Sequence, residues 1–189
     1  VGQDTVILPG TMLQGKTKVG TNCTLGPDTQ LTDVICGDGN HLNRVYAHSC
    51  ELGDNNEIGP FVHLRPETCL HNDIKIGNFV EVKNSDVDDG TKLPHLIYCG
   101  DSDLGKNVNF GCGTVTVNFD GKNKHRCTID EHAFIGCNTN LVAPVHIGAR
   151  AFTAAGSTIT KDVPAKALAV GRAKQVNIEN WVKEDTYKD

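Results

Sequence analysis

The sequence predicts an all-β solenoid, and three observations lead to that fold class. Aliphatic residues recur every six positions along most of the chain, glycine occurs 20 times, and aromatic residues make up only 5% of the composition. An even period is compatible with strand alternation, whereas anchors six apart on a helix would rotate by about 120° at each step. Short strands with one inward residue each bury their faces only when hexads wind into triangular coils that stack. We therefore expect a parallel β-helix of hexapeptide repeats.

Three series of aliphatic anchors carry the six-residue period, and only one anchor, Thr153, is not aliphatic. A glycine often follows the anchor, as in V19-G20 and I135-G136, and supplies backbone freedom beside a buried side chain. Each hexad is therefore predicted to be a short strand followed by a turn. The anchors are Val1, Ile7, Leu13, Val19, Leu25 and Leu31; Leu52, Ile58, Leu64, Leu70, Ile76 and Val82; and Ile129, Ile135, Leu141, Ile147, Thr153 and Ile159.

The period is interrupted at four places. It loosens at residues 32 to 51, slips by one residue at Val87 and again at Leu104, and breaks fully between Thr116 and Ile129. Inserted residues in a solenoid leave as a loop from one face, often the binding face, so we expect a loop at about 117–128. The turn sequence N-F-D-G lies within it.

After Ile159 the repeat ends, and we expect Pro164 to stop the coil and residues 175 to 185 to form a short helix that caps the open end. The predicted organisation is a β-helix domain at 1–163 and a C-terminal tail at 164–189. Val1 stands in phase with the repeat where an initiator methionine would be, so we expect the natural chain to extend further toward its N-terminus.

Composition narrows the functional classes. A net charge of -5 argues against a general nucleic-acid or anionic-membrane surface. No signal peptide and no run of 18 apolar residues is visible, which favours a cytoplasmic protein. The eight cysteines never form a C-x-x-C pair, so they are interpreted as reduced thiols rather than zinc ligands or a disulfide framework. They occupy positions 23, 36, 50, 69, 99, 112, 127 and 137.

Six longer motifs resemble one known family. They are "IGPFVHLRP" (58 to 66), "IGNFVEVK" (76 to 83), "HLIYCGD" (95 to 101), "NVNFGCGTVTVNFDGKNK" (107 to 124), "LVAPV" (141 to 145) and "VGRAKQ" (170 to 175). Together they are similar to the acetyltransferase domain of the bifunctional bacterial N-acetylglucosamine-1-phosphate uridylyltransferase/glucosamine-1-phosphate N-acetyltransferase family. The resemblance covers roughly residues 52 to 175.

The resemblance implies left-handed coils, a homotrimer with its site between adjacent subunits, and acetyl-CoA as cosubstrate with no metal required for acetyl transfer. The expected product is N-acetylglucosamine 1-phosphate for UDP-N-acetylglucosamine and cell-envelope synthesis. The nucleotide-binding pattern L-x-x-G-x-G-T-x-M is missing from the sequence, so we expect no uridylyltransferase domain or activity in this chain.

Acetyl transfer to an amine needs a base, and a histidine, with an unperturbed pKa near 6.5, is suited to that role near neutral pH. Within "HLIYCGD", His95 matches the family's general base. Glu81 alternates with Lys83 on one strand face and is predicted to orient His95 or the amine. The other histidines lack such a setting, and no pair has metal-binding spacing.

The two substrates need further groups, which the resemblance assigns. Cationic side chains must meet the sugar phosphate, and backbone N–H groups of the glycine-rich "FGCGT" are candidates for stabilising the oxyanion. Cys112 and Cys137 depart from the alanine or serine that is commoner in the family. The predicted acceptor residues are Arg65, Lys83, Tyr98, Asn109 and Lys124, and the predicted acetyl-CoA residues are Cys112, Asn118, Phe119, Cys137, Ala155 and Arg172.

Three alternatives remain open at this point. A related hexapeptide acetyltransferase with a neutral acceptor would not require the cations Arg65, Lys83 and Lys124. A metal-dependent carbonic anhydrase of the same fold would need three converging histidines, and its H-x-x-x-x-H spacing is missing. A non-catalytic scaffold would leave the interruption at residues 93 to 126 unexplained.

Overall fold

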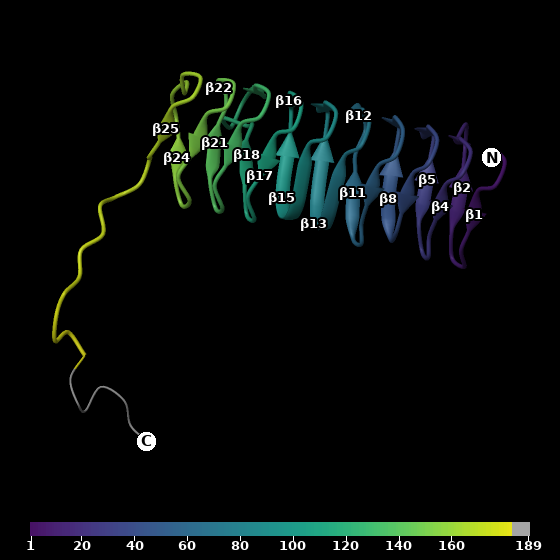
Figure 1. Ribbon diagram of the computed structural model, residues 1–189, viewed down its shortest axis with the longest axis horizontal. Helices are drawn as coiled ribbons and strands as arrows, with labels where there is room; N and C mark the ends of the chain where they lie inside the picture. The colour runs from purple at the N-terminus through teal and green to yellow at the C-terminus, as the bar shows by residue number, and fades with distance from the viewer. Residues whose placement is uncertain (183–189) are drawn as a thin grey trace.

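The computed structural model describes residues 1–182 as a solenoid of 25 β-strands, with no helix among the described residues. The strands pair in parallel and wind into a left-handed β-helix of about 10 turns, with the N-terminus at one end and an extended C-terminal segment leaving the other (Figure 1). The predicted fold class is confirmed.

The solenoid has three faces, which we name after their first strands. Two long strands, β13 (Lys75–Lys83) and β15 (Lys92–Gly100), bend around a corner and contribute to both the β1 face and the β2 face. The β1 face also holds β1 (Val6–Ile7), β4 (Thr24–Leu25), β7 (His41–Leu42), β10 (Glu57–Ile58), β17 (Asn109–Phe110), β20 (Phe134–Ile135), β23 (Phe152–Thr153) and β25 (Leu168–Ala169). The β2 face also holds β2 (Met12–Gln14), β5 (Gln30–Thr32), β8 (Val45–His48), β11 (Val62–Leu64), β18 (Val115–Val117), β21 (Asn140–Val142) and β24 (Thr158–Ile159). The β3 face holds β3 (Lys18–Val19), β6 (Ile35–Cys36), β9 (Cys50–Leu52), β12 (Thr68–Leu70), β14 (Asp86–Val87), β16 (Ser102–Leu104), β19 (Cys127–Ile129) and β22 (Val145–Ile147).

Strand register explains both the period and its slips. Val6 pairs with Thr24, so one coil equals three hexads of sequence. The coil from Ile35 is shorter, because Ile35 pairs with Glu51, which comes before three full hexads are complete. At the two places where the sequence slips, each coil is one residue short of three hexads. The shorter coils have shorter turns between their strands, so the inward side chains of successive coils still stack on one another.

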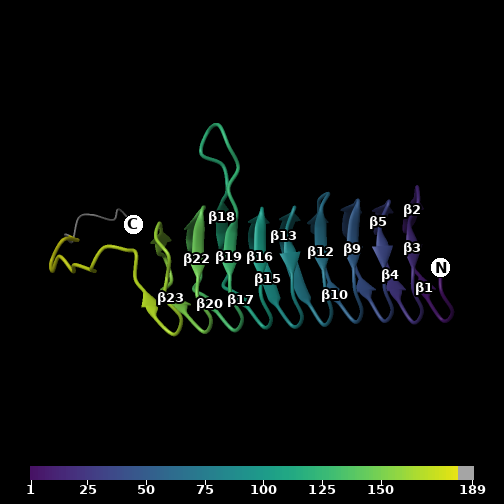
Figure 2. The ribbon, with the colours of Figure 1, turned by 90° about the horizontal axis from the view of Figure 1, so that it is seen from above.

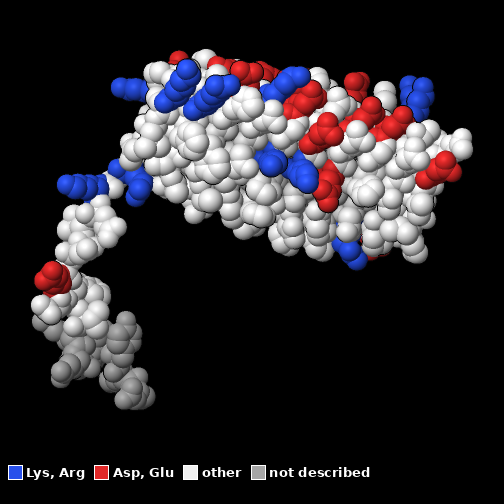
Figure 3. Space-filling model, in the orientation of Figure 1, with Lys and Arg blue, Asp and Glu red and all other residues white. Residues whose placement is uncertain are grey.

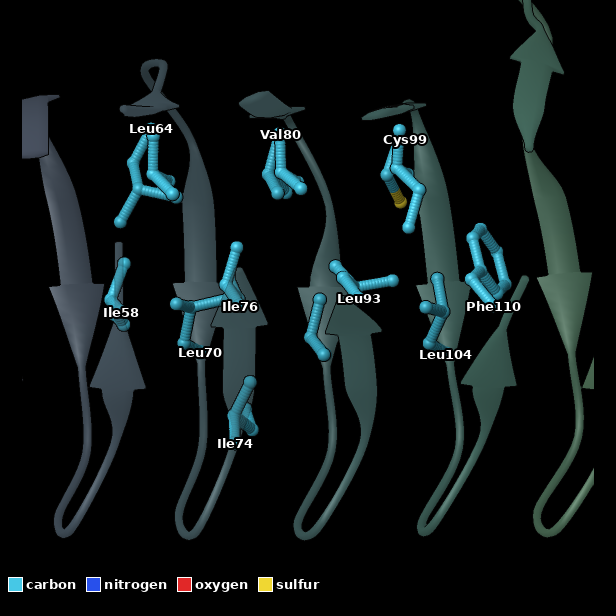
Figure 4. Packing of buried hydrophobic residues seen from close by; sticks show 14 of the residues in the cluster. Ile58, Leu64, Leu70, Ile74, Ile76, Val80, Leu93, Cys99, Leu104 and Phe110 are labelled. Carbon is cyan, nitrogen blue, oxygen red and sulfur yellow. The ribbon is translucent and has the colours of Figure 1, made fainter. Parts of the chain in front are cut away.

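The core is a narrow aliphatic column inside the coils. The anchors predicted from Val19 onward are buried, and Figure 4 shows Leu64, Leu70 and Leu93 among the side chains that fill the interior. Thr153 is also buried, and its hydroxyl accepts the Gly136 N–H at 3.0 Å, so the polar atom is satisfied. The first two anchors are exposed, Val1 at 69% and Ile7 at 48%, because they lie in the first coil and are covered on one side only.

The predicted loop leaves the solenoid between β18 and β19. Asp103 pairs with Thr128, well beyond three hexads along the chain, so this coil carries an insertion, and residues 118–126 project outward (Figure 2). Asp120 closes the loop tip: its Oδ1 accepts the backbone N–H groups of Lys122 and Asn123 at 2.8 and 2.6 Å. These bonds and the His125 ring hold the pKa of the Asp120 carboxyl well below its usual range.

The C-terminal part departs from expectation in two ways. The coil does not stop at Pro164, since β25 follows it and pairs with β23, and Pro164 lies in a turn where its carbonyl accepts the Ala167 N–H. The helix predicted at 175–185 is wrong over 175–182, where the chain is irregular, and its last residues lie outside the described part. Val176 and Ile178 are β-branched and 80% and 71% exposed, so no packing surface stabilises a helix there. Over residues 1–182, no helix is long and apolar enough to cross a membrane.

Candidate functional site

The three predicted cations converge at the edge of the β2 face from which the loop projects. Arg65 and Lys83 occupy the same outward row on successive coils, because the Arg65 N–H bonds the carbonyl of Val82. Lys124 reaches back from the loop to Lys83, and the neighbouring ammonium lowers the pKa of Lys124. Two cationic heads held together form a site suited to an anion. Figure 3 shows a small group of charged side chains over β11 to β15, on a face that is otherwise largely uncharged.

Arg65 is paired with Glu81. Its Nη1 lies 2.8 Å from Glu81 Oε1, and this bond raises the pKa of the Arg65 guanidinium. Glu81 sits next to Tyr98 in the strand register rather than next to His95. The orienting role of Glu81 toward His95 therefore stays a prediction, and in this structure its carboxylate serves Arg65.

A buried carboxylate, that of Asp101, lies next to Lys83, and it was not among the residues predicted from the sequence. The Asp101 side chain is 4% exposed, with Oδ1 3.8 Å from Lys83 Nζ, and it accepts a hydrogen bond from the Asn118 amide through Oδ2. Asn118 also lies 3.3 Å from the Tyr98 hydroxyl. Gly100 makes room for this contact, because a Cβ there would lie 2.5 Å from the Tyr98 oxygen and 2.8 Å from Asn118 Nδ2. The sequence feature that could have identified Asp101 as a site residue is its place directly after Gly100 in the motif "HLIYCGD".

Most of the predicted acetyl-CoA residues form a column at the opposite corner, where the β1 face turns into the β2 face. The Asn138 N–H bonds the Cys112 carbonyl at 2.7 Å and the Gly156 N–H bonds the Cys137 carbonyl at 2.8 Å, so Cys112 and Cys137 stack on successive coils with Ala155 next in line. Arg172 packs beside Gly156. Cys112 is half-buried and Cys137 is exposed. We call Cys112, Cys137, Ala155 and Arg172 the corner column.

The other predicted residues divide between the two groups. His95 is exposed at the corner in β15, and Asn109 is half-buried in β17 beside Lys92. Asn118 and the exposed Phe119 stand at the loop base with the cations, away from the corner column. Along β15, His95 is five residues from Gly100, the neighbour of Lys83, which is roughly 16 Å at the rise of a strand. One chain therefore places its histidine and its cations at opposite edges of the β2 face.

An apolar surface borders both groups. Phe61, Phe79 and Leu96 are 53%, 57% and 57% exposed, and all three have left-handed backbone conformations with φ between 53° and 60°. Such conformations are costly for bulky residues, and exposed aromatic clusters mark contact surfaces. The two phenylalanine rings stack with centroids 5.3 Å apart. These three side chains, which we call the corner ladder, line a groove of about 820 Å³ that also reaches Tyr98.

Comparison with known proteins relates the chain to part of one curated protein. No protein-family model matches it. The chain is 53% identical over 182 residues to the bifunctional protein GlmU of a Geobacillus species, and 55% identical over 184 residues to GlmU of Caldanaerobacter subterraneus. The alignments cover 96% and 97% of this chain. These alignments fit the C-terminal acetyltransferase domain of GlmU.

The chain spans 40% of the length of these GlmU relatives. Among solved structures, an Arabidopsis UDP-N-acetylglucosamine acyltransferase superimposes with a TM-score of 0.58 at 15% identity, over 90% of this chain and 66% of that one. At that identity the likeness concerns the fold alone. The GlmU relationship agrees with the family that the sequence motifs indicated.

The carbonic anhydrase alternative is not favoured by the arrangement of histidines. In residues 1–182, the groups of side chains close enough to share a metal ion are Cys69, His71 and Asp86, and His71 with Asp88 and Asp89. Each group contains a single histidine, whereas that alternative requires three.

Proposed function

We propose that this chain transfers an acetyl group from acetyl-CoA to the 2-amino group of glucosamine 1-phosphate. The observation that carries the proposal is the convergence of Arg65, Lys83 and Lys124 on one edge of the β2 face. Lys83 and Lys124 lie close enough to repel each other, and a sugar phosphate bound between them offsets that repulsion. The relationship to GlmU supports the same acceptor. The product is N-acetylglucosamine 1-phosphate.

In this proposal the amine of the sugar attacks the thioester carbonyl carbon, and His95 accepts the proton that the amine loses. The tetrahedral oxyanion is stabilised by backbone N–H groups in the turn at Cys112 and Gly113, since the Gly111 N–H already donates to the Ile135 carbonyl. The C–S bond then breaks, and the CoA sulfur leaves and takes up a proton. Arg172 pairs with a phosphate of CoA, and the corner column holds the pantetheine arm beside His95.

We further infer that the working enzyme is a homotrimer. A base and a phosphate site at opposite edges of one face favour a cleft in which one chain supplies His95 and its neighbour supplies the cations. The corner ladder of Phe61, Phe79 and Leu96 is an apolar surface that a second copy would cover. All eight cysteines are free, which fits a reducing compartment, and we place the reaction in the cytoplasm.

The test compares two acceptors in wild-type protein and in Lys83→Ala. With glucosamine 1-phosphate, we expect the acceptor KM to rise about 10- to 100-fold in Lys83→Ala, because a charge-assisted contact to the phosphate is lost. With unphosphorylated glucosamine, the same substitution should change KM by less than about twofold, since no phosphate contacts Lys83.

Lys75→Ala is the matched control, because Lys75 is an exposed lysine of the same strand that pairs with Glu57 on the β1 face. The measurement is thiol release from acetyl-CoA. Equal kcat/KM for both acceptors in the wild-type protein would contradict the proposal and favour a hexapeptide acetyltransferase with a neutral acceptor.

A further inference from the structure

The buried carboxylate of Asp101 takes part in none of the steps above, although it is the most enclosed charge near the site. Its side chain is 4% exposed. Three groups converge on it: the Lys83 ammonium at 3.8 Å, the Asn84 amide at 2.5 Å and the Asn118 amide. Burying a carboxylate is costly unless it is paired and hydrogen-bonded. Asp101 meets that condition only while these three groups stay in place.

The backbone of Asp101 ties down the loop as well. Its carbonyl accepts the Cys127 N–H at 3.1 Å at the end of the loop, and its carboxylate binds Asn118 at the start. The two sides of the loop are joined at its base by the hydrogen bond from the His125 N–H to the Asn118 carbonyl at 2.8 Å. One residue thus anchors both ends of the segment that carries Lys124.

The same carboxylate contacts residues that are predicted for both substrates. Lys83 and Lys124 belong to the proposed phosphate site, whereas Asn118 is one of the predicted acetyl-CoA residues. We propose that Asp101 is a positioning residue: it holds Lys83 and Lys124 together as one anion site, fixes the Asn118 amide, and so couples acceptor binding to acetyl-CoA binding. This inference rests on the proposed function.

Two opposite effects decide what Asp101→Asn should do. Removing the negative charge of Asp101 increases the attraction of the site for phosphate, but Lys124 is exposed and solvent and salt screen that gain. Against it stands the loss of the charged hydrogen bonds and ion pair that hold Lys83, Asn84 and Asn118 in place. An asparagine also has one acceptor oxygen where the carboxylate has two, so one of the two amide partners would meet another donor. The loss outweighs the gain, and affinity should fall.

We therefore expect Asp101→Asn to raise both the acceptor KM and the acetyl-CoA KM by roughly tenfold, whereas Lys83→Ala raises only the acceptor KM. Asp103→Asn is the matched control. It removes the same charge two residues away, at a side chain that pairs with Arg126 on the β3 face. A change in only one KM, or equal changes in Asp103→Asn, would overturn the coupling.

Double-mutant cycles separate positioning from general loosening. If Asp101 acts through Lys83 and Asn118, then Lys83→Ala should add little to the acceptor KM of Asp101→Asn, and Asn118→Ala should add little to its acetyl-CoA KM. Additive effects would contradict the inference. Should Asp101→Asn fail to fold, the Lys83→Ala/Asn118→Ala cycle decides, because both residues contact Asp101 and a non-additive acceptor KM is expected.

Calorimetric binding of glucosamine 1-phosphate and of CoA distinguishes failure of this inference from failure of the proposed function. A wild-type protein that binds both ligands without transfer would refute the proposed reaction, and the Asp101 effect on both affinities would still be measured. A wild-type protein that binds neither would refute both.

Discussion

At the scale of single residues, His95 and the buried cysteines differ in how far their side chains are exposed to solvent. His95 is exposed at the corner of β15, and no hydrogen bond to its ring is found within residues 1–182. The deeply buried cysteines are the opposite case: burial raises the pKa of Cys50 and of Cys99 to about 11 and that of Cys127 to about 12. Their thiols stay protonated near neutral pH and are enclosed, whereas Cys112 is half-buried and Cys137 is exposed to reagents.

His95→Ala should lower kcat about 10²- to 10⁴-fold, because general-base catalysis contributes that much. Its thermal unfolding midpoint should change little, since the side chain is exposed. His146→Ala is the control, because His146 lies on the β3 face and bonds Asp130. Steady-state rates of thiol release measure the effect, and an unchanged kcat would remove His95 from the base role.

Alkylation of the native protein with a small thiol reagent should modify Cys137 readily and Cys112 more slowly, and saturating acetyl-CoA should protect both. Cys69, half-exposed on the β3 face, serves as the internal reference. Peptide mass spectrometry locates the modified residues. Identical modification of Cys137 with and without acetyl-CoA would mean that the family's cofactor positions do not transfer to the corner column.

At the scale of the strand, each coil depends on its inward anchor. Leu64 ends β11 with no exposure, between coils on both sides, whereas Ile7 in β1 is an anchor of the first coil and has one open side. A cavity inside a stack is enclosed by neighbours that relax only partly, so its cost exceeds the loss of the methyl groups alone. Position along the solenoid therefore sets the cost of the same substitution.

Leu64→Ala should lower the free energy of unfolding by about 2 to 5 kcal/mol, which is typical of a fully buried leucine. Ile7→Ala should lower it by less than about 1 kcal/mol, because much of that side chain already contacts water. Denaturant unfolding followed by circular dichroism compares the two. Equal costs would indicate that the first coil is covered in solution.

At the scale of the whole molecule, the two halves of the site lie at opposite edges of one face. The proposed trimer brings the His95 edge of one chain to the Lys83 edge of the next, with the corner ladder between them. Closed rings use such head-to-tail contacts, in which each subunit offers two different surfaces.

Mixing His95→Ala chains with Lys83→Ala chains under subunit exchange should restore activity at low acceptor concentration, where each variant alone is nearly inactive. Random assembly around a closed ring gives roughly a quarter of the sites with both residues intact. Sedimentation should show three chains in the active species. No recovery despite proven exchange would mean that His95 and Lys83 act within one chain, and an active monomer would remove the trimer.

The β-helix, its core anchors and the position of the loop could all be predicted from the amino-acid sequence. This was possible because each hexad repeats the same local pattern, an inward aliphatic residue followed by a turn. The motifs likewise located the cations, which the stacking of coils does bring together. These features depend on single residues or on short sequence motifs, so they can be recognised without the tertiary structure.

Which residues meet across coils depends on the three-dimensional stacking and could not be predicted from the sequence. Partners there are separated by nearly three hexads of sequence, and by more across the loop, so no short pattern contains them. The Asp101 network, the separation of His95 from Lys83, and the continuation of the coil past Pro164 all depend on how successive coils stack. The tail helix failed for the same reason: residues 175–182 find no surface to pack against, and packing rather than local propensity stabilises a short helix.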